Sequence, residues 1–98
     1  MNSFIKEIKL VYLSHQENKY ERLVEKSIKM MERDTVKKVD VLNLQLKKLD
    51  VLNNLIYGYS EIFENSTLEE DKTFASNRIE VFSMFRKKEI ETAKHIIL

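Results

Sequence analysis

The sequence predicts an all-α protein: an antiparallel bundle of three long helices preceded by a short N-terminal helix. The 98 residues include one glycine and no proline, so the tight turns on which β-hairpins depend have few suitable residues. Charged residues make up 34% of the chain, and this proportion, with abundant Leu and Ile, is typical of long helices and coiled coils. A chain of this length forms one domain at most, which we assign to residues 1–98.

The apolar residues of the first third of the chain fall on two sides of a helical wheel. At 3.6 residues per turn, Phe4 and Val11 lie roughly opposite Tyr20 and Val24. One straight helix cannot bury both groups in a single core. The phase therefore indicates either a break in the helix or a continuous helix whose two halves face different neighbours.

The polar segment SHQEN is where we place the break. Ser14 and Glu17 have the S-x-x-E spacing of a capping box, in which each side chain bonds a free backbone N–H of the other residue. We therefore predict a short helix over about 3–13 and a second helix over about 15–32. A single continuous helix over this region is the alternative.

The third predicted helix covers about 36–64, with Asp34 or Thr35 as its N-cap. Its apolar residues alternate at spacings of three and four, as in a coiled coil, and the pattern continues in phase across the glycine. The stripe consists of Val39, Leu42, Leu46, Leu49, Ile56 and Phe63. Gly58 falls on the polar side, so we expect it on the surface of a helix, where it costs about 1 kcal/mol relative to alanine.

The last helix is expected over about 67–96. Ser66 and Glu69 again have capping-box spacing, and the acidic residues that follow favour the positive end of the helix dipole. Arg78 lies beside the apolar face of this helix and is expected to pair with an acid from another helix.

The apolar arc of the helix predicted over 36–64 is unusually wide. It covers roughly 200° of the wheel, whereas one side of a small bundle needs little more than about 100°. The arc is explained either by neighbouring helices on both sides or by contact with another chain, including a second copy in a two-fold dimer. The predicted interface consists of Val51, Leu52, Leu55, Tyr59 and Ile62.

Charges are segregated along the chain although the formal net charge is only +1. In an antiparallel bundle the start of the 36–64 helix and the end of the last helix would meet, forming a basic pole. Its residues would be Lys37, Lys38, Arg86, Lys87, Lys88 and Lys94. Acidic residues would gather at the opposite end, over 61–71. The alternative is neutralisation by neighbours, for example of Glu61 and Glu64 by Lys6 and Lys9.

Several classes of chemistry have no support in the sequence. The chain lacks cysteine and any phosphate-binding loop or nucleophile motif. His15 and His95 are the only histidines; Glu91 and His95 share a helix face but lack further ligands at matched spacing. We therefore predict no catalytic residues, metal, cofactor or small-molecule substrate.

The chain is expected to be cytoplasmic. Phe4 to Leu13 is interrupted by charges, unlike a secretory signal, and no window is apolar enough for membrane insertion. Frequent Lys, Asn and Ile are consistent with a low-GC bacterium or its phage.

These observations favour a small, non-enzymatic protein–protein interaction or regulatory protein of the inhibitor, adaptor, immunity or chaperone type. It would bind a protein partner, or itself as a homodimer, through the apolar strip of the 36–64 helix. The alternative is a nucleic-acid-binding regulator that uses the basic pole.

Overall fold

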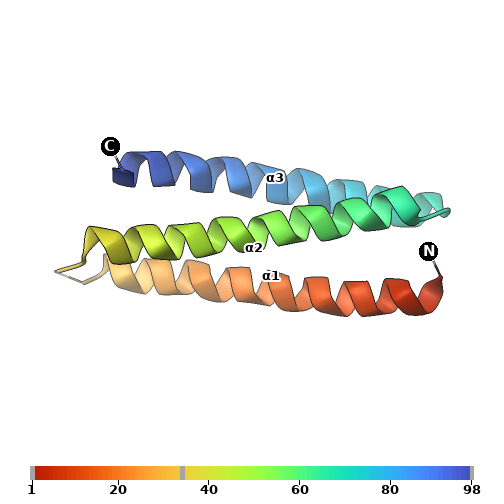
Figure 1. Ribbon diagram of the computed structural model, residues 1–98, viewed down its shortest axis with the longest axis horizontal. Helices are drawn as coiled ribbons and strands as arrows, with labels where there is room; N and C mark the ends of the chain where they lie inside the picture. Colours follow the sequence, from red (N-terminus) through yellow and green to blue (C-terminus); the bar gives the residue numbers. More distant parts are fainter. Residues whose placement is uncertain (1, 34, 98) are drawn as a thin grey trace.

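The computed structural model describes residues 2–33 and 35–97, which form three long helices and no strand. These are α1 (Ser3–Met31), α2 (Lys38–Asn65) and α3 (Glu69–Ile97). In Figure 1 the helices lie side by side, with α2 between α1 and α3 and antiparallel to both. The Cα extents of 51 × 22 × 15 Å describe an elongated and somewhat flattened bundle. The all-α bundle expected from the sequence is confirmed.

α1 is a single helix, so the prediction of two helices over 3–13 and 15–32 is wrong and the continuous alternative is right. The start of α1 is fixed by Asn2, whose side-chain oxygen accepts a hydrogen bond from the Ile5 backbone N–H at 2.8 Å. Ser14 lies inside the helix. The opposed apolar groups need no helix break, because Phe4 and Val11 are exposed while Tyr20 is buried.

The connections between helices are short. α2 begins at Lys38, two residues later than predicted, and its N-cap Lys37 makes no side-chain capping bond. The predicted cap Asp34 lies outside the described residues, and Thr35 precedes the observed cap. α3 begins at Glu69 rather than near 67.

The predicted capping box at the start of α3 is absent. Ser66 ends α2 by donating its backbone N–H to the Ile62 carbonyl at 3.0 Å. Its buried hydroxyl oxygen has no hydrogen-bond partner within the described ranges. Glu69, Glu70 and Asp71 do occupy the first turn of α3, where the helix dipole favours acids.

The core lies along the face of α2 that α1 and α3 cover together. Leu13 and Tyr20 enter it from α1, and Ala75 and Phe82 enter it from α3. α2 supplies the largest share: Val51, Leu52, Leu55, Tyr59 and Ile62.

The stripe expected to enter the core reaches it only in part: Leu42, Leu49 and Ile56 are half-buried, and Ile56 packs against the core. Val39 and Leu46 are 57% and 52% exposed, and Phe63 is also exposed. The core instead uses the other edge of the wide arc. Residues of both α1 and α3 pack on that edge of α2, so it is the edge that is buried.

Candidate functional site

The five residues predicted as a protein interface are buried within this chain. Val51, Leu52, Leu55, Tyr59 and Ile62 are each at most 2% exposed. They pack against α1 and α3 in the core, so they present no surface to another chain. The prediction of a protein interface at these residues is therefore wrong. The alternative, that neighbouring helices cover α2 on both sides, accounts for their burial.

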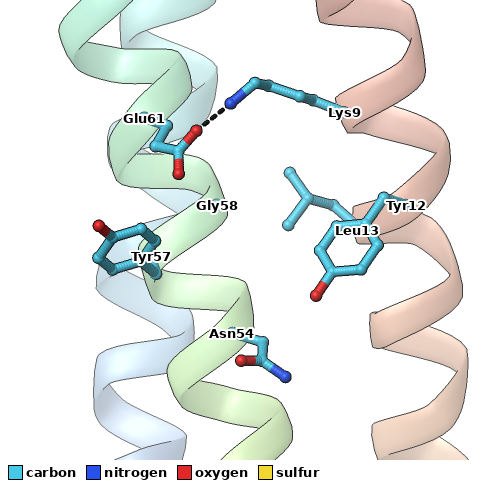
Figure 2. Close-up of a pocket in the computed structure, with 7 residues that line it drawn as sticks. All are labelled: Lys9, Tyr12, Leu13, Asn54, Tyr57, Gly58 and Glu61. Atoms are coloured by element: carbon cyan, nitrogen blue, oxygen red, sulfur yellow. Dashed lines mark hydrogen bonds and ion pairs between the residues drawn. The ribbon is translucent and has the colours of Figure 1, made fainter.

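The sequence predicts Gly58 on the free surface of a helix, but the structure shows it in a contact between two helices. It lies where α1 and α2 approach each other, and Figure 2 shows the Leu13 side chain of α1 directed at it. A Cβ built at Gly58 would overlap the Leu13 Cδ2 and lie 3.3 Å from its Cγ. Gly58 is therefore a close-packing position between helices rather than a free surface residue.

The hollow around Gly58 is small, about 230 Å³, and one side of it is closed by the Lys9–Glu61 ion pair drawn in Figure 2. At the same end of the bundle Lys6 pairs with Asp71 at 3.1 Å. The acidic end of the bundle is thus partly neutralised by α1. Of the pairings considered from sequence, Lys9 with Glu61 is confirmed, whereas Lys6 contacts Asp71 instead.

A groove of about 560 Å³ runs between α1 and α3. Val24 lines it on α1, and Val81 and Phe85 line it on α3. The chain itself bridges this groove, because Tyr20 stacks on Phe85 with ring centroids 5.9 Å apart. The groove is therefore already partly occupied by side chains of its own walls.

Two carboxylates tie the three helices together across this groove. Glu17 of α1 accepts a hydrogen bond from Tyr59 of α2 at 2.9 Å and pairs with Arg78 of α3 at 3.2 Å. The pairing expected for Arg78 is confirmed. Burial, followed by the bond to Glu17, raises the pKa of Tyr59 well above its ordinary value.

Glu89 of α3 forms the second such cluster. Its carboxylate pairs with the buried Lys48 at 3.0 Å and accepts bonds from Gln45 at 2.5 Å and from Tyr20 at 3.4 Å. Burial, followed by the charge of Glu89, raises the pKa of Tyr20 to about 12. Both clusters hold helices together, and every titratable group in them is already bonded to a neighbour.

An apolar cavity of about 300 Å³ lies at the end of the bundle where α1 stops and α2 begins. Met30, Leu44 and Ile96 line it, together with Gln45 and Lys48. These last two side chains are bound to Glu89, so neither is free to orient a polar ligand.

The predicted basic pole is dispersed. Arg86 bonds Asn53 at 3.1 Å, and Asn53 lies sixteen residues along α2 from Lys37, a separation of roughly 24 Å. Lys94 pairs with Glu91 on its own helix. The exposed Lys38, Lys87 and Lys88 complete the set, so the six cations do not form one patch.

Histidines and carboxylates of the described residues do not gather into a metal site. No group of three or more His, Asp or Glu residues able to hold a metal ion occurs among residues 2–33 and 35–97. Within the same ranges, no helix has the length and apolar character needed to cross a membrane.

An exposed apolar cluster lies on the outer face of α1, directed away from α2. Phe4, Ile8 and Val11 are 70%, 54% and 59% exposed. With Glu7 they surround a shallow hollow of about 300 Å³. These four positions, spaced i, i+3, i+4 and i+7, are the ones that form a hole for a knob of a facing helix in coiled coils.

The sequence contained the signal for this surface. The apolar residues of 4–11 and those of 20–24 fall on opposite sides of the helical wheel. In the structure both groups belong to one helix, the first exposed and the second facing its neighbours. The signal was interpreted as a helix break instead of an outward-facing stripe.

Comparison of the chain with protein-family models, curated proteins and solved structures finds no match.

Proposed function

We propose that this is a small non-enzymatic protein–protein interaction protein, and that it binds a helix of another protein on the outer face of α1. The observation that carries the proposal is the exposure of Phe4, Ile8 and Val11 on the face that points away from the core. Contiguous exposed apolar side chains on a helix face are typical of interaction surfaces. Burying them against a partner removes apolar area from water, worth about 25 cal/mol for each Å².

The shape of the surface favours a helix as the occupant. The hollow bounded by Phe4, Glu7, Ile8 and Val11 has the four-residue geometry that receives a single side chain from a facing helix. The outer face of α1 is straight and unobstructed, since the structure places α2 and α3 on its other sides. This proposal replaces the strip of α2 predicted from sequence.

A crosslinking experiment tests the proposal in cells that express the protein. A photoreactive amino acid is placed at position 8, and in a second variant at position 57, because Tyr57 is even more exposed than Ile8 (72% against 54%) but lies on α2. We expect a protein crosslink from position 8 only, mapped to a helix of the partner with apolar residues at three- and four-residue spacing.

A substitution pair supplies the control. Ile8→Glu should remove the crosslinked partner from co-purification while the thermal unfolding curve stays unchanged, because Ile8 is exposed. Tyr57→Glu should leave both unchanged. Equal crosslinking from positions 8 and 57, no crosslink from position 8, or unfolding of the Ile8→Glu variant would each contradict the proposal.

A further inference from the structure

We infer that the partner helix carries a row of carboxylates beside its apolar residues, because the outer face of α1 becomes cationic in its second half. This inference rests on the proposed function. The apolar stripe of Phe4, Ile8 and Val11 is continued in phase by four basic residues at spacings of three, four and three. These residues are Lys19, Arg22, Lys26 and Lys29.

The two groups form one continuous surface. At 3.6 residues per turn the three apolar residues and the four cations fall within about 80° of the helix circumference. All seven side chains are exposed. A straight helix lying on α1 would therefore meet the apolar half first and the cationic half about two turns later.

Within residues 2–33 and 35–97, none of the four cations forms an ion pair. The ion pairs of these residues involve Lys6, Lys9, Lys48, Arg78 and Lys94. Glu25 lies three residues from Arg22 and four from Lys29, but it lines the α1–α3 groove, and no ion pair of the described residues joins it to either cation. Like charges at i+3 and i+4 repel one another, so neutralisation by a bound partner is favourable.

A second copy of the chain does not fit this surface. Two outer faces of α1 packed in parallel would place cations against cations, which disfavours pairing. Packed antiparallel in full register, the cations of each copy would face the apolar residues of the other. A partner helix with apolar residues in one half and Asp or Glu in the other would bury the apolar half of this surface and neutralise its cationic half.

Synthetic helical peptides provide the test. One peptide of about 28 residues carries Leu at the knob positions opposite the apolar half of the stripe and Glu at those opposite the cationic half, in parallel and antiparallel versions. A matched pair carries Gln in place of Glu. Binding to the full chain is measured by fluorescence anisotropy at low and at high salt.

We expect the Glu peptide of one orientation to bind roughly ten-fold more tightly than its Gln counterpart at low salt, and the difference to shrink at high salt. Arg22→Glu/Lys26→Glu should abolish this preference, and a peptide with Lys in place of Glu should regain binding to that variant. Lys87→Glu/Lys88→Glu, which reverses exposed cations on α3, should retain the preference.

The two proposals fail in different ways. Equal binding of the Glu and Gln peptides, with both lost in Ile8→Glu, overturns the acidic-partner inference and leaves the proposed function standing. Failure of every peptide to bind contradicts both. Salt-dependent binding of duplex DNA that requires Arg22 and Lys26 but not Ile8 overturns the inference in favour of a nucleic-acid partner.

Discussion

The Leu13 side chain of α1 fills the space that a side chain at Gly58 of α2 would occupy. A Cβ at Gly58 would overlap Leu13 Cδ2, and Leu13 is completely buried. Gly58 is helical with no positive φ, so backbone freedom is not the reason for a glycine here. The glycine allows α1 and α2 to approach closely, and this contact positions α1 on the bundle.

Gly58→Ala should therefore depend on what occupies position 13. In the natural chain we expect a loss of about 1 kcal/mol of unfolding free energy, because overpacking outweighs the gain in helix propensity. In a Leu13→Ala background the same change should stabilise by up to about 1 kcal/mol, since the overlap is gone. Denaturant unfolding of the four proteins measures the coupling. Equal effects of Gly58→Ala in both backgrounds would show that the contact with Leu13 does not require a glycine at position 58.

The Glu89 cluster is expected to matter more for stability than the ion pairs at the surface. Glu89→Ala leaves the buried Lys48 without its counter-charge, and such a loss typically costs about 3–5 kcal/mol. Glu61→Ala removes the more exposed pair with Lys9, for which we expect no more than about 1 kcal/mol.

Replacing both members of the buried pair separates charge from packing. Lys48→Met/Glu89→Leu should recover most of the stability lost in Glu89→Ala, because no buried charge remains unpaired. Chemical denaturation compares the variants. A double variant as unstable as Glu89→Ala would indicate that Gln45 and Tyr20 depend on the carboxylate more than Lys48 does.

Stability should fall at alkaline pH through the two buried tyrosines. The pKa of Tyr20 is raised to about 12 by burial and Glu89, and the pKa of Tyr59 is raised by burial and Glu17. A raised tyrosine pKa means that the folded state favours the neutral phenol. For Tyr20, the contribution of this preference to the free energy of unfolding is complete below the ordinary pKa of 10.0. It is lost as the pH rises through about 12.

Phenylalanine variants isolate this effect from lysine titration. Between pH 10 and 12, wild-type unfolding free energy should decline more steeply than that of Tyr20→Phe or Tyr59→Phe. Unfolding curves at fixed pH, with phenolate absorbance recorded in parallel, provide the measurement. Identical slopes in all three proteins would rule out a contribution from these phenols.

The fold class was accessible from sequence, whereas the buried face of α2 was not. Two stripes on this helix alternate at three- and four-residue spacing. In the stripe through Val39 and Leu46, these two residues and Phe63 are exposed, and the remaining apolar members are half-buried. The buried face of α2 includes Gln45 and Lys48, and Gly58 lies in its contact with α1, although all three resemble surface residues. Their contacts are with Glu89 and Leu13, partners distant in sequence that no local pattern identifies.

The outer face of α1 was missed for a different reason. Its phase was visible, but an apolar stripe was assumed to be core, and a capping-box match at Ser14 offered a plausible break. Capping boxes require free backbone N–H groups, which residues inside a continuous helix do not have. The spacing alone was therefore insufficient to locate a helix start.

Capping at the start of α1 gives a direct measurement of which residue begins the helix. Asn2 accepts the Ile5 N–H, so Asn2→Ala should lower the unfolding free energy by about 0.5–2 kcal/mol. Ser14→Ala places a stronger helix former inside a continuous helix and should be neutral or stabilising by a few tenths of a kcal/mol. Thermal and denaturant unfolding compare the two variants. A larger loss from Ser14→Ala than from Asn2→Ala would indicate that a helix starts at residue 15 after all, and the outer stripe of α1 would then not be continuous.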